Sequence, residues 1–219
     1  MTEEAIRVFL ETTPKRTFAA ALDWPGWCRS AKTEDEALET LATYADRYRD
    51  ALRGSANPLP AGAEDRLRVV ERADGDASTI FGVPGRVASA DRAPADVVAA
   101  RRLAEVVAAA WAAFDRIVAA APAELRKGPR GGGRDTAKIV EHVVASDHGY
   151  TRGLGIRISA PSPGDPAAVA ALRDAMLAVL RRPSDGTSLS KRWTLRYAAR
   201  RIAWHALDHA WEIEDRTEP

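Results

Sequence analysis

The chain has 219 residues, 46% hydrophobic and 29% charged, which is typical of a globular protein with one large or two small domains. Its 32 basic and 31 acidic residues leave a formal net charge of +1, which gives no electrostatic reason to expect nucleic-acid or anionic-membrane binding. The single cysteine, Cys28, excludes an internal disulfide and suits a reducing compartment. Because the N-terminus does not resemble a signal peptide and the longest apolar run, 106–114, is too short to span a bilayer, we expect a cytoplasmic protein.

The first third of the chain predicts a small α+β unit. Thr33 and Glu36 have the spacing of a capping box, and Gly54 follows the helical pattern that they begin. Residues 23–33 contain a Pro-Gly turn between two tryptophans. The elements expected over residues 1–75 are strands at 6–11 and 17–22, a helix at 33–52 and a strand at 65–73. This order is a ββαβ arrangement.

A linker rich in glycine, proline, aspartate and serine is expected at residues 76–93, with a short strand at 78–83. Long helical patterns then follow one another with no strand pattern between them. They cover residues 94–122, 136–155, 166–182 and 193–216. Residues 94–219 therefore predict an up-down four-helix bundle, and the whole chain an α+β fold.

Two of the four histidines, His205 and His209, lie four residues apart in "RRIAWHALDHAWEIEDR". On a helix they project within about 40° of each other, one turn apart, so both can reach one divalent cation. Their neighbours at helical spacing are apolar, which favours a buried metal site in the bundle. The alternative is that each imidazole simply finds a hydrogen-bond partner.

The expected third ligand is His142, which follows the apolar pair Ile139 and Val140 in the second long helix. His148 is the other candidate, but it lies six residues further on, about 240° round the helix, so both cannot face one seam. Among the nearby acidic residues, Asp208 and Glu212 are predicted to orient a ligand through hydrogen bonds to it. Trp204 is a candidate for lining the pocket.

The segments "IVEHVVASDHGYTRGLG" and "RRIAWHALDHAWEIEDR" resemble the DinB-like (YfiT-type) four-helix bundle proteins over residues 94–216. The resemblance implies that His142, His205 and His209 bind zinc, nickel or a similar divalent ion. It also implies an open coordination position. Characterised members of that family include transferases that use bacillithiol or mycothiol and a mycothiol-dependent isomerase.

The loop "KGPRGGGRD" places Lys127, Arg130 and Arg134 around three glycines just before a helix. Exposed backbone N–H groups and guanidinium groups there would suit a carboxylate or phosphate. A flexible, solvated turn is the favoured interpretation, with Arg130 and Arg134 as the first choice for an anion site.

The N-terminal stretch "RVFLETTPKRTFAAALDWPGWCRSAKTEDEALETLATYADRY" resembles the HicB-like antitoxin fold over residues 5–52. No DNA-binding segment accompanies it, so a lid, dimerisation or gating module is expected in place of a toxin-binding role. The leading hypothesis is a metal-dependent enzyme, such as a transferase that joins a low-molecular-weight thiol to an electrophile, and the alanine-rich outer face of the bundle suits pairing into a homodimer. The alternative is a non-catalytic binding or stress-response module whose HicB-like part recognises a partner protein.

Overall fold

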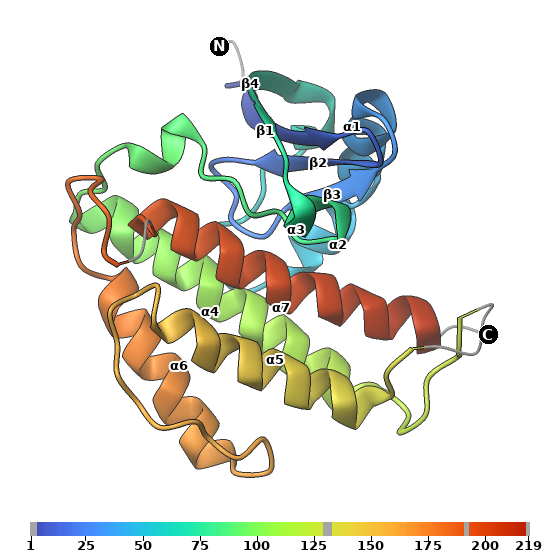
Figure 1. The fold of residues 1–219 in the computed structure, drawn as a ribbon, viewed down its shortest axis with the longest axis vertical. Helices are drawn as coiled ribbons and strands as arrows, with labels where there is room; N and C mark the ends of the chain where they lie inside the picture. Colours follow the sequence, from blue (N-terminus) through green and yellow to red (C-terminus); the bar gives the residue numbers. More distant parts are fainter. Residues whose placement is uncertain (1–3, 129–132, 191–192, 218–219) are drawn as a thin grey trace.

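The computed structural model describes residues 4–128, 133–190 and 193–217 of the chain, and it shows an α+β protein (Figure 1). The N-terminal part is built around a four-stranded mixed sheet, and the rest is helical. Within the described ranges, no helix has both the length and the apolar character needed to cross a membrane.

The sheet has the strand order β3-β2-β1-β4, with β1 antiparallel to β2 and parallel to β4. The strands are β1 (Ile6–Thr13), β2 (Arg16–Ala21), β3 (Cys28–Ala31) and β4 (Leu67–Asp74). Three of them were predicted. Strand β3 was not, because its four residues lie in a stretch dominated by turn signals and are too few to show an alternating pattern.

The predicted helix after β3 is divided in two, α1 (Glu34–Thr43) and α2 (Ala45–Ala51), with Tyr44 between them. The capping box of Thr33 and Glu36 is present, with both of its hydrogen bonds. The indole N–H of Trp27 donates to the carbonyl of Leu41 at 2.9 Å. Helix α1 therefore lies against β2 and β3 on one face of the sheet, and α2 leads on toward β4.

Residues 76–93 lie against the opposite side of β1 and β2, and they do not form the strand predicted at 78–83. They contain the short helices α3 (Ala77–Ile80) and η2 (Ser89–Arg92), while η1 (Ala63–Arg66) precedes β4. The side chain of Asp76 caps α3, which explains why a helix forms there. The buried carboxylate of Glu11 accepts hydrogen bonds from the backbone of Gly85 and Arg86 and from Thr79, and so fixes this segment.

The four long helices predicted from the sequence are present, although their ends differ by a few residues. They are α4 (Val97–Ala120), α5 (Thr136–Thr151), α6 (Pro166–Leu180) and α7 (Leu195–Thr217). Helix α7 packs along α4 and against α5, and α6 packs against α4 and α5 (Figure 1). Helix α4 begins after Asp96, whose side chain accepts from the N–H of Ala99, rather than at the predicted Pro94.

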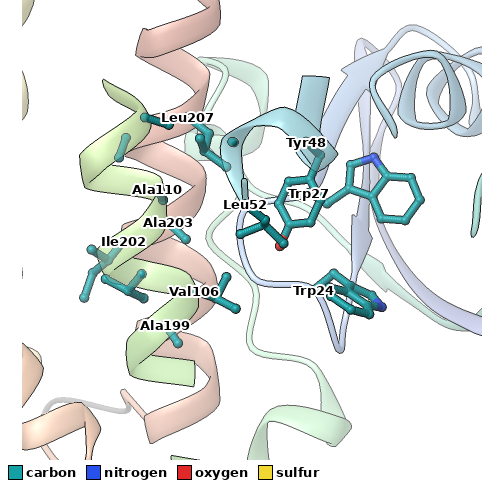
Figure 2. Packing of buried hydrophobic residues seen from close by; sticks show 14 of the residues in the cluster. Trp24, Trp27, Tyr48, Leu52, Val106, Ala110, Ala199, Ile202, Ala203 and Leu207 are labelled. Atoms are coloured by element: carbon teal, nitrogen blue, oxygen red, sulfur yellow. The ribbon is translucent and has the colours of Figure 1, made fainter. Parts of the chain in front are cut away.

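One hydrophobic core continues from the sheet unit into the long helices (Figure 2). The cluster includes Trp24, Trp27, Tyr48 and Leu52 of the N-terminal unit, Val106 and Ala110 of α4, and Ala199, Ile202, Ala203 and Leu207 of α7. Gly26 has φ +94°, and a Cβ there would lie 2.8 Å from the Cδ1 of Leu207. Only glycine at position 26 lets the Trp24–Trp27 loop approach α7 this closely.

A buried ion pair also joins α7 to the N-terminal half. The Arg200 Nε donates to the Asp91 Oδ1 at 2.8 Å, and the two residues are 8% and 2% exposed. Arg200 is buried because residues 76–93 cover this side of α7.

Candidate metal centre

Helices α5 and α7 bring the three predicted histidines together. The ring centre of His142 lies 5.1 Å from that of His205 and 4.9 Å from that of His209, and the last two are 4.7 Å apart. His142 projects beside the fully buried Ile139 and Val143, which hold α5 against its neighbours. The four-residue spacing on α7 and the contact with α5 thus place three imidazoles at one point.

The nitrogen atoms of this cluster lie close to one another. The Nε2 atoms of His142 and His205 are 3.2 Å apart, and one ligand atom from each histidine lies within 4.8 Å of the other two. Bonds of about 2.05 Å to a tetrahedral Zn²⁺ would put neighbouring nitrogens about 3.3 Å apart. The His142–His205 pair has this spacing, and three imidazoles are a donor set suited to a divalent ion of the zinc or nickel type.

Burial keeps this cluster from bulk water on most sides. His205 is 5% exposed, the side chain of His209 is 12% exposed, and His142 is half-buried. The rings of Tyr150 and Trp204 lie 5.6 and 5.9 Å from that of His205. The Nδ1 of His205 is buried without a hydrogen-bond partner in the described part of the chain, so aromatic packing and the contact of its Nε2 with His142 orient this ring.

Glu212 orients the third imidazole. Its Oε2 lies 2.7 Å from the Nδ1 of His209, and its Oε1 accepts from Arg216 at 2.9 Å. The bond to His209, together with the nearby guanidinium, lowers the pKa of the Glu212 carboxyl and keeps it ionised. A carboxylate on Nδ1–H leaves the Nε2 of His209 as a free electron-pair donor, which is the arrangement that metal-binding histidines commonly have.

The surroundings also favour the neutral form of the other two rings. Burial lowers the pKa of His142, and it lowers the pKa of His205 further. The positive charge of Arg134 acts in the same direction on both rings, and Arg201 adds to the effect on His205. Neutral imidazole is the form that binds a metal ion, so the cluster is prepared for a cation near neutral pH.

The other residues considered as ligands or orienting groups lie elsewhere. The carboxylate of Asp208 accepts from Arg29 of β3 at 2.9 Å, and no bond from it to a cluster histidine is found among the described residues. The Nε2 of His148 lies 2.9 Å from the carbonyl oxygen of Ile158, away from the cluster. Of the two predicted orienting acids, Glu212 contacts a cluster histidine, whereas Asp208 joins α7 to the sheet.

The loop before α5 is only partly described. Arg130 lies outside the described residues, and Lys127 forms an ion pair with Asp135. Arg134 is exposed, yet its charge helps to lower the pKa values of His142 and His205, so it lies within electrostatic reach of the cluster. An anion approaching the histidines would therefore meet a positive potential from this side.

Two side chains next to the cluster did not stand out as site residues in the sequence. Arg201 precedes His205 by four residues, and Tyr150 follows His142 by eight, so both continue the stripes that carry the histidines. This spacing was the signal in the sequence, but it identifies Arg201 and Tyr150 as neighbours of the cluster only when α5 is known to pack against α7.

The remaining candidates behave as packing residues. Trp204 is buried against Phe18 of β2, with ring centres 6.1 Å apart, as well as against His205. Cys28 is buried in the same small cluster, and burial raises the pKa of its thiol to about 12, so it is not a nucleophile at neutral pH.

Comparison of the chain with protein-family models, curated proteins and solved structures finds no match.

Proposed function

We propose that this protein is a divalent-metal-dependent enzyme that transfers a low-molecular-weight thiol to an electrophile, and that its long helices form an up-down bundle of the DinB-like type. The observation that carries the proposal is the convergence of His142, His205 and His209. Three nitrogen ligands leave a fourth position open on a tetrahedral ion, as catalytic sites require, whereas structural zinc sites usually have four protein ligands. Zinc and nickel are the ions that this donor set suits best.

The residues of the chain have distinct tasks in this proposal. His142 and His205 present their Nε2 atoms from opposite helices, and Glu212 holds His209 in the tautomer that exposes its own Nε2. A divalent ion bound there would lower the pKa of a thiol that reached it, so that a thiolate would be available at neutral pH. The covering aromatic rings keep the site partly dry, which strengthens electrostatic interactions within it.

A positive setting around the cluster further supports an anionic substrate. Arg134 and Arg201 both act electrostatically on His205. A thiolate is stabilised by such cations, and so is a carboxylate elsewhere on the same molecule. The N-terminal sheet unit supplies Phe18 behind Trp204 and so forms part of the wall of the site.

The test is a thiol-transfer assay with the purified protein loaded with Zn²⁺ or Ni²⁺. With L-cysteine and 1-chloro-2,4-dinitrobenzene, a carbon–sulfur bond forms, chloride leaves and the thiol proton passes to water. We expect the loaded protein to accelerate this reaction, and His205→Ala to abolish the acceleration. Equal rates for the loaded protein, the metal-free protein and His205→Ala across a panel of small thiols and electrophiles would refute the proposed activity.

A further inference from the structure

The stripe that carries the histidines continues beyond them with an arginine that no acid among the described residues neutralises. Arg201, His205 and His209 follow one another at four-residue intervals on α7. Arg201 is half-buried, and in the described part of the chain no carboxylate lies within 4.0 Å of its guanidinium. Its neighbour Arg200, by contrast, forms a buried pair with Asp91.

The position of this guanidinium is fixed by three neighbours. It lies over the ring of Trp204 at 4.8 Å and over the ring of Tyr150 at 5.5 Å, measured from Cζ to the ring centres. One of its NH groups donates to the carbonyl of Pro84 at 3.0 Å. Two aromatic faces and one neutral acceptor orient the group but leave its charge uncompensated.

The facing stripe on α5 supplies hydroxyl groups. Tyr150 lies against both Arg201 and His205, and Ser146 lies halfway between His142 and Tyr150 in the four-residue spacing. Ser146 is half-buried, and no hydrogen bond from its hydroxyl to another described residue is found. This face therefore has a metal-binding end and, about 6 Å further along α7, an end with a cation and donors.

An isolated positive charge at this place is unfavourable unless an anion joins it. A divalent ion at the histidines would repel Arg201, and the partial burial of the guanidinium weakens its screening by water. A carboxylate accepts two parallel N–H bonds from a guanidinium, which makes it the natural partner for such a group.

We propose that Arg201 and the hydroxyl of Tyr150 form a carboxylate-binding subsite, so that the ligand of this centre carries a carboxylate about one helical turn from the atom that meets the metal. The inference rests on the proposed function and narrows its substrate class to small anionic thiols. It selects the half-buried Arg201 in preference to the exposed Arg134 as the group that binds the carboxylate.

The experiment uses the full chain loaded with Co²⁺, and its readout is the sulfur-to-cobalt charge-transfer absorption, which reports binding without turnover. The probes are 3-mercaptopropionate and its methyl ester, titrated at one fixed pH. Because the two thiols differ in acidity, the ratio of their dissociation constants is compared between proteins. We expect Arg201→Gln to reduce the preference for the free acid by on the order of 10- to 100-fold and to lower the affinity for the ester much less, because the ester loses only the electrostatic effect of Arg201 on its thiolate.

Two variants serve as comparisons. Arg134→Gln removes an equal charge from an exposed position near the cluster and should retain most of the preference. Tyr150→Phe keeps the ring that stacks on Arg201 but loses the hydroxyl, and should reduce the preference by about 3- to 10-fold. Continued binding of the ester to the cobalt-loaded variant shows that the variant is folded and has an intact metal centre.

The outcomes separate the two proposals. If the preference is the same in the wild-type protein, Arg201→Gln and Tyr150→Phe, the subsite is refuted while thiol binding at the metal stands. Loss of the preference in Arg134→Gln with retention in Arg201→Gln would move the anion site to the loop and overturn the assignment. If cobalt is bound and neither thiol produces the absorption, the proposed function fails and the subsite with it.

Discussion

Replacement of Asp147 by asparagine should stabilise the protein at alkaline pH and lose this advantage in acid. Asp147 lies on α5, on the side away from the histidines, and is 1% exposed. Neither of its carboxylate oxygens has a hydrogen bond of normal geometry to another described residue, and the Nε of Arg173 is 3.8 Å away. Burial therefore raises the pKa of this carboxyl from 3.8 to about 7, although the charge of Arg173 opposes the change.

The magnitude follows from that pKa difference. A difference of about 3 corresponds to about 4 kcal/mol of destabilisation of the folded state when the group is fully ionised. Because the folded-state pKa is raised, the folded protein retains a proton that the unfolded chain loses above pH 3.8. The unfolding free energy is therefore free of this penalty in acid. It falls by about 1.4 kcal/mol per pH unit above pH 4, and the penalty is complete once the pH passes about 7.

The asparagine side chain in the Asp147→Asn variant would be neutral at every pH, so the difference in unfolding free energy between this variant and the wild-type protein isolates the carboxyl group. We expect the unfolding free energy of the variant, relative to that of the wild-type protein, to rise by about 2–3 kcal/mol between pH 5 and pH 8. The assay is urea unfolding of EDTA-treated protein, followed by far-UV circular dichroism and tryptophan fluorescence. Asp174→Asn, at an exposed position on α6, is the control and should show no such shift. A difference for Asp147→Asn that changes by less than about 0.5 kcal/mol between the two pH values would refute the argument.

Three further outcomes follow from the packing around α7. Gly26→Ala should lower the unfolding free energy by about 1–3 kcal/mol, seen as a lower urea midpoint, because the new Cβ meets α7 and φ is +94°; an unchanged midpoint would show that the loop can move away. Arg200→Leu should cost about 3–5 kcal/mol because it leaves Asp91 buried and unpaired, whereas a loss below about 1 kcal/mol would show that Asp91 finds another partner. Glu212→Gln should weaken Zn²⁺ binding about 10- to 100-fold, because Glu212 orients His209; competition with a chromophoric chelator measures this affinity. An unchanged affinity would show that Glu212 does not orient a metal ligand.

The sequence predicted the elements with strong periodicity and clear caps. The capping box at Thr33 and Glu36 fixed the start of α1, and the apolar spacing of the long helices revealed all four of them. Prediction from the sequence failed for β3, which is too short to show a pattern. It also failed at residues 78–83, where the cap that Asp76 supplies favours the short helix α3 over the strand that the β-branched residues suggested. Such elements depend on contacts with distant residues, as the bonds of Glu11 to residues 79–86 illustrate.

The histidine cluster was predictable because helical spacing places His205 beside His209, and because the apolar neighbours of His142 favoured it over His148, which cannot face the same seam. The groups around it were less so. Nothing in the sequence shows that Asp208 turns toward Arg29 of the sheet while Glu212 turns toward His209, since both lie within one turn of that histidine. The difference arises from the docking of the sheet unit on α7, which is a tertiary property.

The central claim is that three imidazoles from two helices bind one divalent ion, and metal stoichiometry tests it most directly. The protein is dialysed against Zn²⁺, freed of unbound ion, and analysed by inductively coupled plasma mass spectrometry beside four alanine variants. We predict about one equivalent in the wild-type protein and in His148→Ala, whose imidazole lies outside the cluster, and loss of that equivalent in His142→Ala, His205→Ala and His209→Ala. Full occupancy after replacement of any cluster histidine, in a variant that remains folded by circular dichroism, would contradict the account.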